Sequence, residues 1–194
     1  MYDKTKIPGY LIYEVTNGKP IYFKGYKEVL AGEKKFEWIK GYSTLHCWLK
    51  TNFSSMLVNS IDNTKFDVLS GEPGIKMEGD NWRVAQVAIF KRNKLVLNKK
   101  YAENAPEIVI EIDVHADTED IGSDMKYIRD KVDEYLEKGV QKVIWIFTEA
   151  EIVVTCTEKG KWQVEGWEKD IETIRGATIN IAQMLKQRRE NPAQ

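Results

Sequence analysis

The chain has 194 residues, of which 42% are hydrophobic and 30% are charged, and its formal net charge is −1. This length and composition are typical of one globular domain, and the charge argues against a generally basic nucleic-acid binder. Cys47 and Cys156 lie far apart, with no further Cys or His at zinc-ligand spacing, so we expect reduced thiols and no structural zinc site.

The first predicted element is a β-hairpin. Its strands are Leu11–Val15 and Pro20–Phe23, and Asn17-Gly18 between them supplies the positions of positive φ that a tight turn needs. From about 35 to 61 the apolar residues change to helical spacing. This spacing predicts one long helix, which is either continuous or broken near Gly41.

The middle of the chain predicts a βαβ unit. Phe66–Leu69 and Arg83–Phe90 are expected strands, and Ile108–Asp113 is apolar on both faces until its acidic end, as in a strand buried inside a sheet. A helix over 124–138 follows, which Gly139 would end, and then the apolar strand Val143–Phe147. The order strand, helix, strand predicts a parallel pair at the centre of the sheet.

Two further strands, Glu151–Thr155 and Trp162–Val164, and a final helix over Ala177–Arg189 complete the prediction. We expect one domain over residues 1–175 and a C-terminal helix and tail over 176–194. No stretch approaches about 18 consecutive apolar residues, and the first six residues are not followed by an apolar segment. A cytoplasmic chain without a membrane span is therefore expected.

Two carboxylates stand at the acidic end of the Ile108–Asp113 strand. Because side chains alternate along a strand, Glu111 and Asp113 are expected on the same face. A buried carboxylate is costly unless it is paired or binds a metal, and Mg²⁺ prefers oxygen ligands. The pattern indicates either a metal site or an ordinary strand end whose carboxylates reach solvent.

Lys131 lies at the edge of the apolar stripe of the predicted helix, roughly 60° from Ile128 and about 100° from Val132. From this position its ammonium can reach over the sheet toward Glu111. Taken alone, the pattern favours a surface lysine whose stem covers apolar side chains.

Gln86 is a polar residue in an otherwise apolar predicted strand, so it either closes a hydrogen-bond network or faces a polar pocket. Glu72, in a glycine-rich turn, is a weaker candidate for the same pocket. His115 follows Asp113 closely and is placed to line a site there, whereas His46 is expected on a helix surface or in the core.

Two segments carry a family resemblance. Pro106–Glu111 is similar to Pro-Asp-Leu-Val-Val-Glu, and Lys131–Tyr135, followed by Gly139-Val140 and Trp145, is similar to a Lys…Tyr…Gly-Val…Trp stretch. In this order they resemble the Uma2 family of bacterial restriction-endonuclease-like proteins, part of the PD-(D/E)XK nuclease superfamily. The resemblance starts near the predicted hairpin and runs to about Trp167.

The resemblance implies an α/β restriction-endonuclease-like core with a central mixed β-sheet flanked by helices. It also implies a homodimeric, metal-dependent endonuclease that hydrolyses phosphodiester bonds of nucleic acid, with DNA as the expected substrate. In such enzymes Mg²⁺ or Mn²⁺ acidifies water and offsets charge on the phosphate. Glu111 would then be a metal ligand, and Lys131 the catalytic lysine that positions or activates the attacking water.

Two positions depart from the family's pattern. Gln86 stands where the family has an Asp, and its amide oxygen can bind the metal with one negative charge fewer. Asp113 stands where the superfamily has a Lys, and its carboxylate can return that charge from another position. We therefore expect Glu111, Gln86 and Asp113 around the metal, with Glu111, Lys131 and Asp113 in catalysis. The alternatives are a catalytically inactive relative that binds nucleic acid or a protein partner, and a purely structural interaction module.

Overall fold

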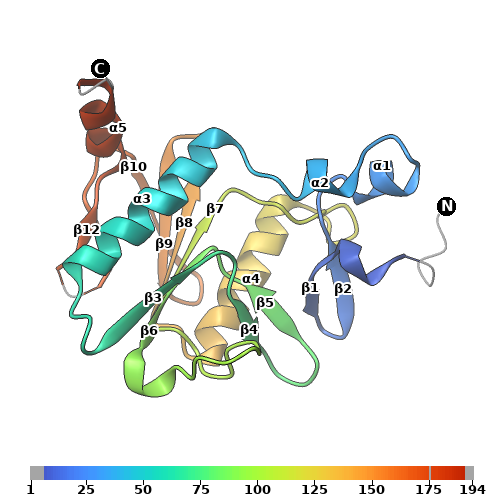
Figure 1. The fold of residues 1–194 in the computed structure, drawn as a ribbon, viewed down its shortest axis with the longest axis horizontal. Helices are drawn as coiled ribbons and strands as arrows, with labels where there is room; N and C mark the ends of the chain where they lie inside the picture. Colours follow the sequence, from blue (N-terminus) through green and yellow to red (C-terminus); the bar gives the residue numbers. More distant parts are fainter. Residues whose placement is uncertain (1–6, 175, 191–194) are drawn as a thin grey trace.

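Figure 1 shows the computed structural model, which describes residues 7–174 and 176–190. The N-terminal residues 1–6, which were part of the basis for expecting a cytoplasmic chain, lie outside the described residues. So does Arg175, where the expected domain boundary falls. Within the described ranges, no helix has the length and apolar character that crossing a membrane requires.

A six-stranded mixed sheet forms the centre of the molecule, in the order β10-β9-β8-β7-β6-β3. The β7 and β8 strands are parallel and are joined by a helix, whereas the other neighbours in this sheet are antiparallel. The predicted βαβ unit and the predicted α/β fold with a mixed sheet are thus confirmed. The strands are β3 (Phe66–Ser70), β6 (Val87–Lys91), β7 (Ile108–Ile112), β8 (Lys142–Phe147), β9 (Ile152–Glu158) and β10 (Lys161–Gly166).

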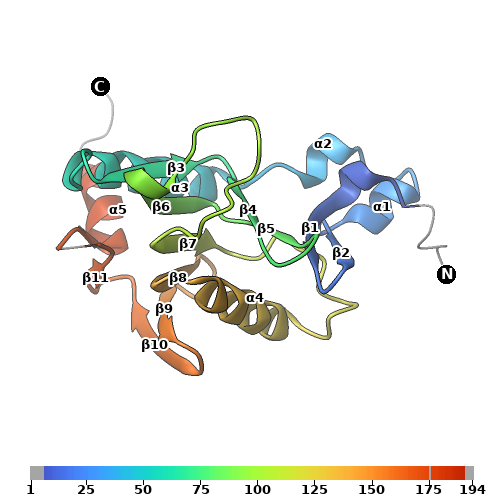
Figure 2. The ribbon, with the colours of Figure 1, turned by 90° about the horizontal axis from the view of Figure 1, so that it is seen from below.

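Two helices cover opposite faces of this sheet, α3 (Thr44–Ser60) and α4 (Asp124–Lys138), as Figure 2 shows. The β7 side chains alternate between them, since Val109 packs in the cluster that contains the apolar stripe of α4 and Ile110 in the cluster that contains α3. Glu111, next along the strand, is therefore on the α4 side.

The helix boundaries follow local signals in the sequence. The Ser123 hydroxyl accepts a hydrogen bond from the Lys126 backbone N–H at 3.1 Å, and Gly139 ends α4 with φ of 109°. The helix expected over 35–61 is broken, as one alternative foresaw, into α2 (Phe36–Ile39) and α3.

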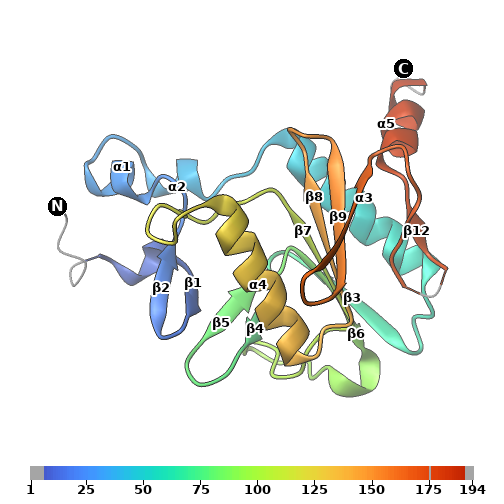
Figure 3. The same cartoon turned by 180° about the vertical axis from the view of Figure 1, so that it is seen from behind.

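A four-stranded antiparallel sheet, of order β2-β1-β5-β4, lies beside α4 (Figure 3). Its hairpin is the predicted one, with positive φ at Asn17 and Gly18. The prediction of one strand over Arg83–Phe90 is wrong, because the chain leaves this sheet after Val84 and enters the central sheet at Val87. The strands are β1 (Ile12–Thr16), β2 (Lys19–Tyr22), β4 (Gly74–Lys76) and β5 (Trp82–Val84).

The C-terminal segment packs on the same core. The helix expected from Ala177 begins later, as α5 (Ile181–Glu190), because β12 (Thr178–Ile179) pairs with β11 (Ile171–Glu172) instead. Ile181 is buried in the cluster that also contains the apolar residues of α3. The remaining elements of the described ranges are η2 (Gly9–Leu11) and η3 (Arg92–Lys94), which are 3₁₀ turns, and the short helix α1 (Tyr26–Leu30).

Candidate functional site

Four charged side chains from four elements meet between α4 and the two sheets. Glu14 comes from β1, Arg83 from β5, Glu111 from β7 and Lys131 from α4. Each of them is at most 1% exposed. The expected approach of Lys131 to Glu111 is present, with 3.0 Å between Nζ and Oε1. We call these four residues the buried charge cluster.

The Lys131 ammonium has three oxygen partners, which match its three N–H donors. They are Oε1 of Glu14 at 2.7 Å, Oε1 of Glu111 at 3.0 Å and the backbone carbonyl of Val84 at 2.8 Å. The alternative of a surface lysine is therefore wrong.

Aromatic rings surround the same ammonium. Its Nζ lies 5.7–5.8 Å from the ring centroids of Tyr13, Tyr127, Tyr135 and Trp145. A cation within about 6 Å of an aromatic face is attracted by the ring quadrupole, more strongly where water is excluded. The rings therefore favour a positive charge at this point.

Glu14 has several hydrogen-bond donors within and around the buried charge cluster. Besides Lys131 it accepts hydrogen bonds from Arg83 Nη1 at 2.8 Å, the Tyr127 hydroxyl at 2.8 Å and the Val84 backbone N–H at 3.0 Å. Burial alone would raise the pKa of Glu14, but the positive charges of Lys131 and Arg83 outweigh burial and lower it. Glu14 is therefore ionised at neutral pH.

Arg83 is held on two sides. Opposite Glu14, its Nε and Nη2 donate to the two carboxylate oxygens of Glu134 at 2.8 and 2.9 Å, and Glu134 also accepts from the Thr16 hydroxyl. Burial alone would lower the pKa of Arg83, but Glu14 and Glu134 raise it above its ordinary value. This arginine ties the hairpin to α4 as a permanent cation.

Glu111 differs from Glu14 in its protonation. Burial raises its pKa to about 7, and the negative charge of Glu14 acts in the same direction, while Lys131 opposes both. The Tyr135 hydroxyl lies 3.1 Å from Oε1. Glu111 can thus bind or release a proton near neutral pH.

Gln86 turns its amide to the backbone of β7. Its Nε2 donates to the Ile112 carbonyl at 3.0 Å, and its Oε1 accepts from the Ile112 N–H at 2.8 Å. Of the two alternatives for this residue, the structure has the closed hydrogen-bond network. Its amide oxygen accepts from the Ile112 N–H, while the Lys131 ammonium bonds to other oxygens.

Asp113 lies just past the end of β7, in left-handed backbone with φ of 54°. Its two carboxylate oxygens accept from the N–H and the hydroxyl of Thr148, each at 2.8 Å. The strand alternation that predicted a face shared with Glu111 does not reach Asp113, and the two carboxylates have separate partners.

The weaker candidates lie around this centre. Oε1 of Glu72 is buried without a hydrogen-bond partner, and burial raises its pKa while Lys131 opposes the shift. His115 Nε2 lies 3.4 Å from His46 Nδ1. Burial lowers the pKa of His115 to about 4 and that of His46 to about 3, so both are neutral at pH 7.

The donor set at the centre fits a hard cation. Among the described residues, no three His, Cys, Asp or Glu side chains group as metal ligands. Two carboxylates and the Val84 carbonyl nevertheless point at one position, and such oxygen ligands suit Mg²⁺ or Mn²⁺. Glu14 and Glu111 would hold the ion, and the Lys131 ammonium takes that position here.

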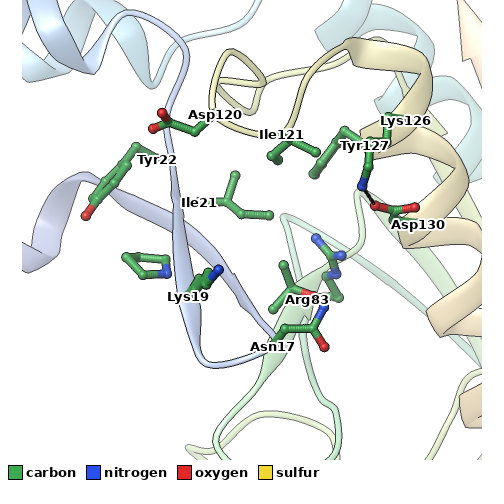
Figure 4. Close-up of a pocket in the computed structure, with 12 residues that line it drawn as sticks. Asn17, Lys19, Ile21, Tyr22, Arg83, Asp120, Ile121, Lys126, Tyr127 and Asp130 are labelled. Atoms are coloured by element: carbon green, nitrogen blue, oxygen red, sulfur yellow. Dashed lines mark hydrogen bonds and ion pairs between the residues drawn. The ribbon is translucent and has the colours of Figure 1, made fainter. Parts of the chain in front are cut away.

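A cavity of about 630 Å³ borders the buried charge cluster (Figure 4). Ile21 and Tyr22 line it from the hairpin, and Arg83 and Tyr127 line it from the side of β5 and α4. The last two both contact Glu14. The cavity thus reaches the cluster through these two side chains, while Glu111 and Lys131 do not line it.

Comparison with known proteins agrees with this fold. Residues 31–182 match the Uma2 family, described as "Putative restriction endonuclease". The chain belongs to this family. A crystal structure from Anabaena variabilis ATCC 29413, described as a putative nuclease belonging to DUF820, is similar to the chain with a TM-score of 0.66. The two sequences are 14% identical, and 94% of this chain and 95% of the other are covered, so this likeness shows the fold. No curated protein matches.

Three members of the buried charge cluster, Arg83, Glu111 and Lys131, lie within the Uma2 match. Glu14 lies ahead of it, and our sequence analysis missed both Glu14 and Arg83. The available signal was a Glu inside the apolar strand Leu11–Val15 and an Arg at the start of another apolar run. Because a buried charge needs a partner, a Glu in one buried strand and an Arg in another could have been predicted to pair.

Proposed function

We propose that this Uma2 protein is a metal-dependent endonuclease that hydrolyses phosphodiester bonds of nucleic acid, with DNA as the expected substrate. The observation that carries the proposal is the buried pair of Lys131 and Glu111, 3.0 Å apart. The descriptions of the family and of the Anabaena protein as nucleases support it. The proposal includes a homodimer, as the sequence resemblance implies, and the cytoplasmic location expected from the sequence.

The roles follow from the contacts. Glu111 and Glu14 would hold Mg²⁺ or Mn²⁺, which when bound acidifies water and offsets negative charge on the phosphate. Lys131 is proposed to supply positive charge near the attacked phosphate. The Tyr135 hydroxyl, 3.1 Å from Oε1 of Glu111, would orient this carboxylate. The ligand roles expected for Gln86 and Asp113 remain predictions.

The second candidate function is nucleic-acid binding without cleavage. The pairing of the Gln86 amide with Ile112 favours it, because Gln86 replaces the Asp of the family's pattern and is engaged with the backbone.

The two candidates separate in one set of measurements on the full chain. Plasmid and single-stranded DNA are incubated with Mn²⁺ or Mg²⁺, and Mn²⁺ binding is followed by calorimetry. The endonuclease proposal expects cleavage that Glu111→Gln abolishes together with Mn²⁺ binding. Glu137→Gln, at the exposed end of α4, is the control and should cleave normally.

Asp113→Asn tests whether Asp113 is a ligand, since a ligand role requires weaker Mn²⁺ binding in this variant. DNA binding without cleavage or Mn²⁺ binding, with a steep salt dependence, would favour the second candidate. A chain that binds neither Mn²⁺ nor DNA would refute both candidates.

A further inference from the structure

The geometry points to a competition between Lys131 and a divalent cation for one set of oxygen ligands. We infer that Mn²⁺ or Mg²⁺ binds this chain where the Lys131 ammonium now lies, and that the ammonium must leave for the metal to bind. The inference rests on the metal-dependent function proposed above and deepens it. Lys131 would then control metal binding in addition to the catalytic role proposed above.

The first observation is the coordination of the ammonium. Glu14 Oε1, Glu111 Oε1 and the Val84 carbonyl lie 2.7, 3.0 and 2.8 Å from Nζ, so three oxygens from three strands converge on one point. Two ionisable carboxylates and a carbonyl are the ligands that hard cations select. A magnesium ion binds such oxygens at about 2.0–2.1 Å, so the three oxygens would have to move closer around it and could not keep their bonds to the nitrogen.

The second observation is the balance of charge. Two cations, Arg83 and Lys131, already face the two carboxylates in a space that excludes water. A divalent cation added with the ammonium in place would stand within a few ångströms of a like charge, and repulsion between buried charges is weakly screened. Metal and ammonium therefore exclude each other at these oxygens.

The third observation is the set of rings. Tyr13, Tyr127, Tyr135 and Trp145 surround Nζ and stabilise its positive charge in the metal-free chain. The ammonium is thus well bound without metal, and a divalent cation must offset this stabilisation. Wild-type metal affinity should consequently be weak.

The test is Mn²⁺ calorimetry on the full chain with Lys131→Met, which keeps most of the side-chain volume and removes the charge. Mn²⁺ should bind this variant roughly tenfold tighter or more than wild type, because the competing charge is gone. Adding Glu14→Gln or Glu111→Gln to Lys131→Met should remove that gain. Lys159→Met, which breaks an exposed ion pair with α4, is the matched control and should bind Mn²⁺ as wild type does.

A second measurement needs no variant and covers the case in which Lys131→Met fails to fold. Acetic anhydride should leave Lys131 unmodified in the metal-free wild type, because its side chain is 1% exposed. Saturating Mn²⁺ should release the amine and make it reactive in peptide mass spectra, with Lys159 labelled equally in both states.

The outcomes separate the inference from the proposed function. Unchanged Mn²⁺ affinity in Lys131→Met, or a Lys131 that stays protected when Mn²⁺ is bound, would overturn the competition while leaving an active endonuclease intact. Tighter Mn²⁺ binding by Lys131→Met in a chain whose wild type never cleaves nucleic acid would support the competition and reject the function.

Discussion

Removing the charge of Glu14 is the sharpest test of the buried charge cluster. Glu14→Gln keeps the size of the side chain but takes an anion from between two buried cations, Arg83 and Lys131. Breaking a buried ion pair from one side costs about 3–5 kcal/mol, because the remaining charge loses its partner. Arg83 keeps both bonds to Glu134, and Lys131 keeps Glu111, so we expect the lower end, about 3 kcal/mol.

Urea unfolding at pH 7 measures this loss. With a slope of about 2 kcal/mol per molar urea, the midpoint should fall by roughly 1.5 M. Glu28→Gln is the control, because its pair with Lys34 is exposed and should leave the midpoint unchanged. A shift of Glu14→Gln no larger than that of the control would refute the argument, since it would mean that the cluster contributes no more than a surface ion pair.

Two further predictions concern Glu111 and Gln86. Because the folded pKa of Glu111 is about 7 against an ordinary value of 4.5, the folded chain binds the extra proton, and stability should fall as the pH rises from 4.5 to 7. In Glu111→Gln the free energy of unfolding, measured by urea unfolding at several pH values, should fall less over this range. If it falls as steeply as in wild type, a group other than Glu111 binds the extra proton. Gln86→Asp should destabilise the chain by about 1–3 kcal/mol, because a shorter carboxylate cannot donate to the Ile112 carbonyl. If Mn²⁺ restores the stability that Gln86→Asp loses, the metal-ligand role predicted for this position would be supported instead.

The parts of the fold with strong local signals could be predicted from the sequence. The capped helix α4, with Ser123 before it and Gly139 after it, has the expected bounds, and two predominantly apolar strands flank it. The predictions were wrong where contacts between segments distant in the sequence determine which secondary structure forms. The strand propensity of Arg83–Phe90 does not show that the two halves of this segment belong to different sheets. The start of α5 is likewise determined by the pairing of β12 with β11.

The same division holds at the candidate site. Strand alternation and helical angle, which are local rules, place Lys131 within reach of Glu111, but by themselves they favoured a surface lysine. Glu14 joins them from the distant N-terminal hairpin, and no periodic pattern predicts such a contact. The left-handed backbone of Asp113 was also beyond a rule that assumes a continuing strand.

The charges around Gln86 bear on its departure from the Asp of the family's pattern. Glu14 and Glu111 supply two carboxylates, and Arg83 and Lys131 supply two cations, while Glu134 adds a bond to the outer side of Arg83. An Asp at position 86 would bring a further negative charge close to β7, which a divalent cation could neutralise. Gln86 brings none and uses its amide to hold Ile112, so Arg83 and Lys131 together balance Glu14 and Glu111. Metal binding in this chain should therefore depend more on Lys131 than on position 86.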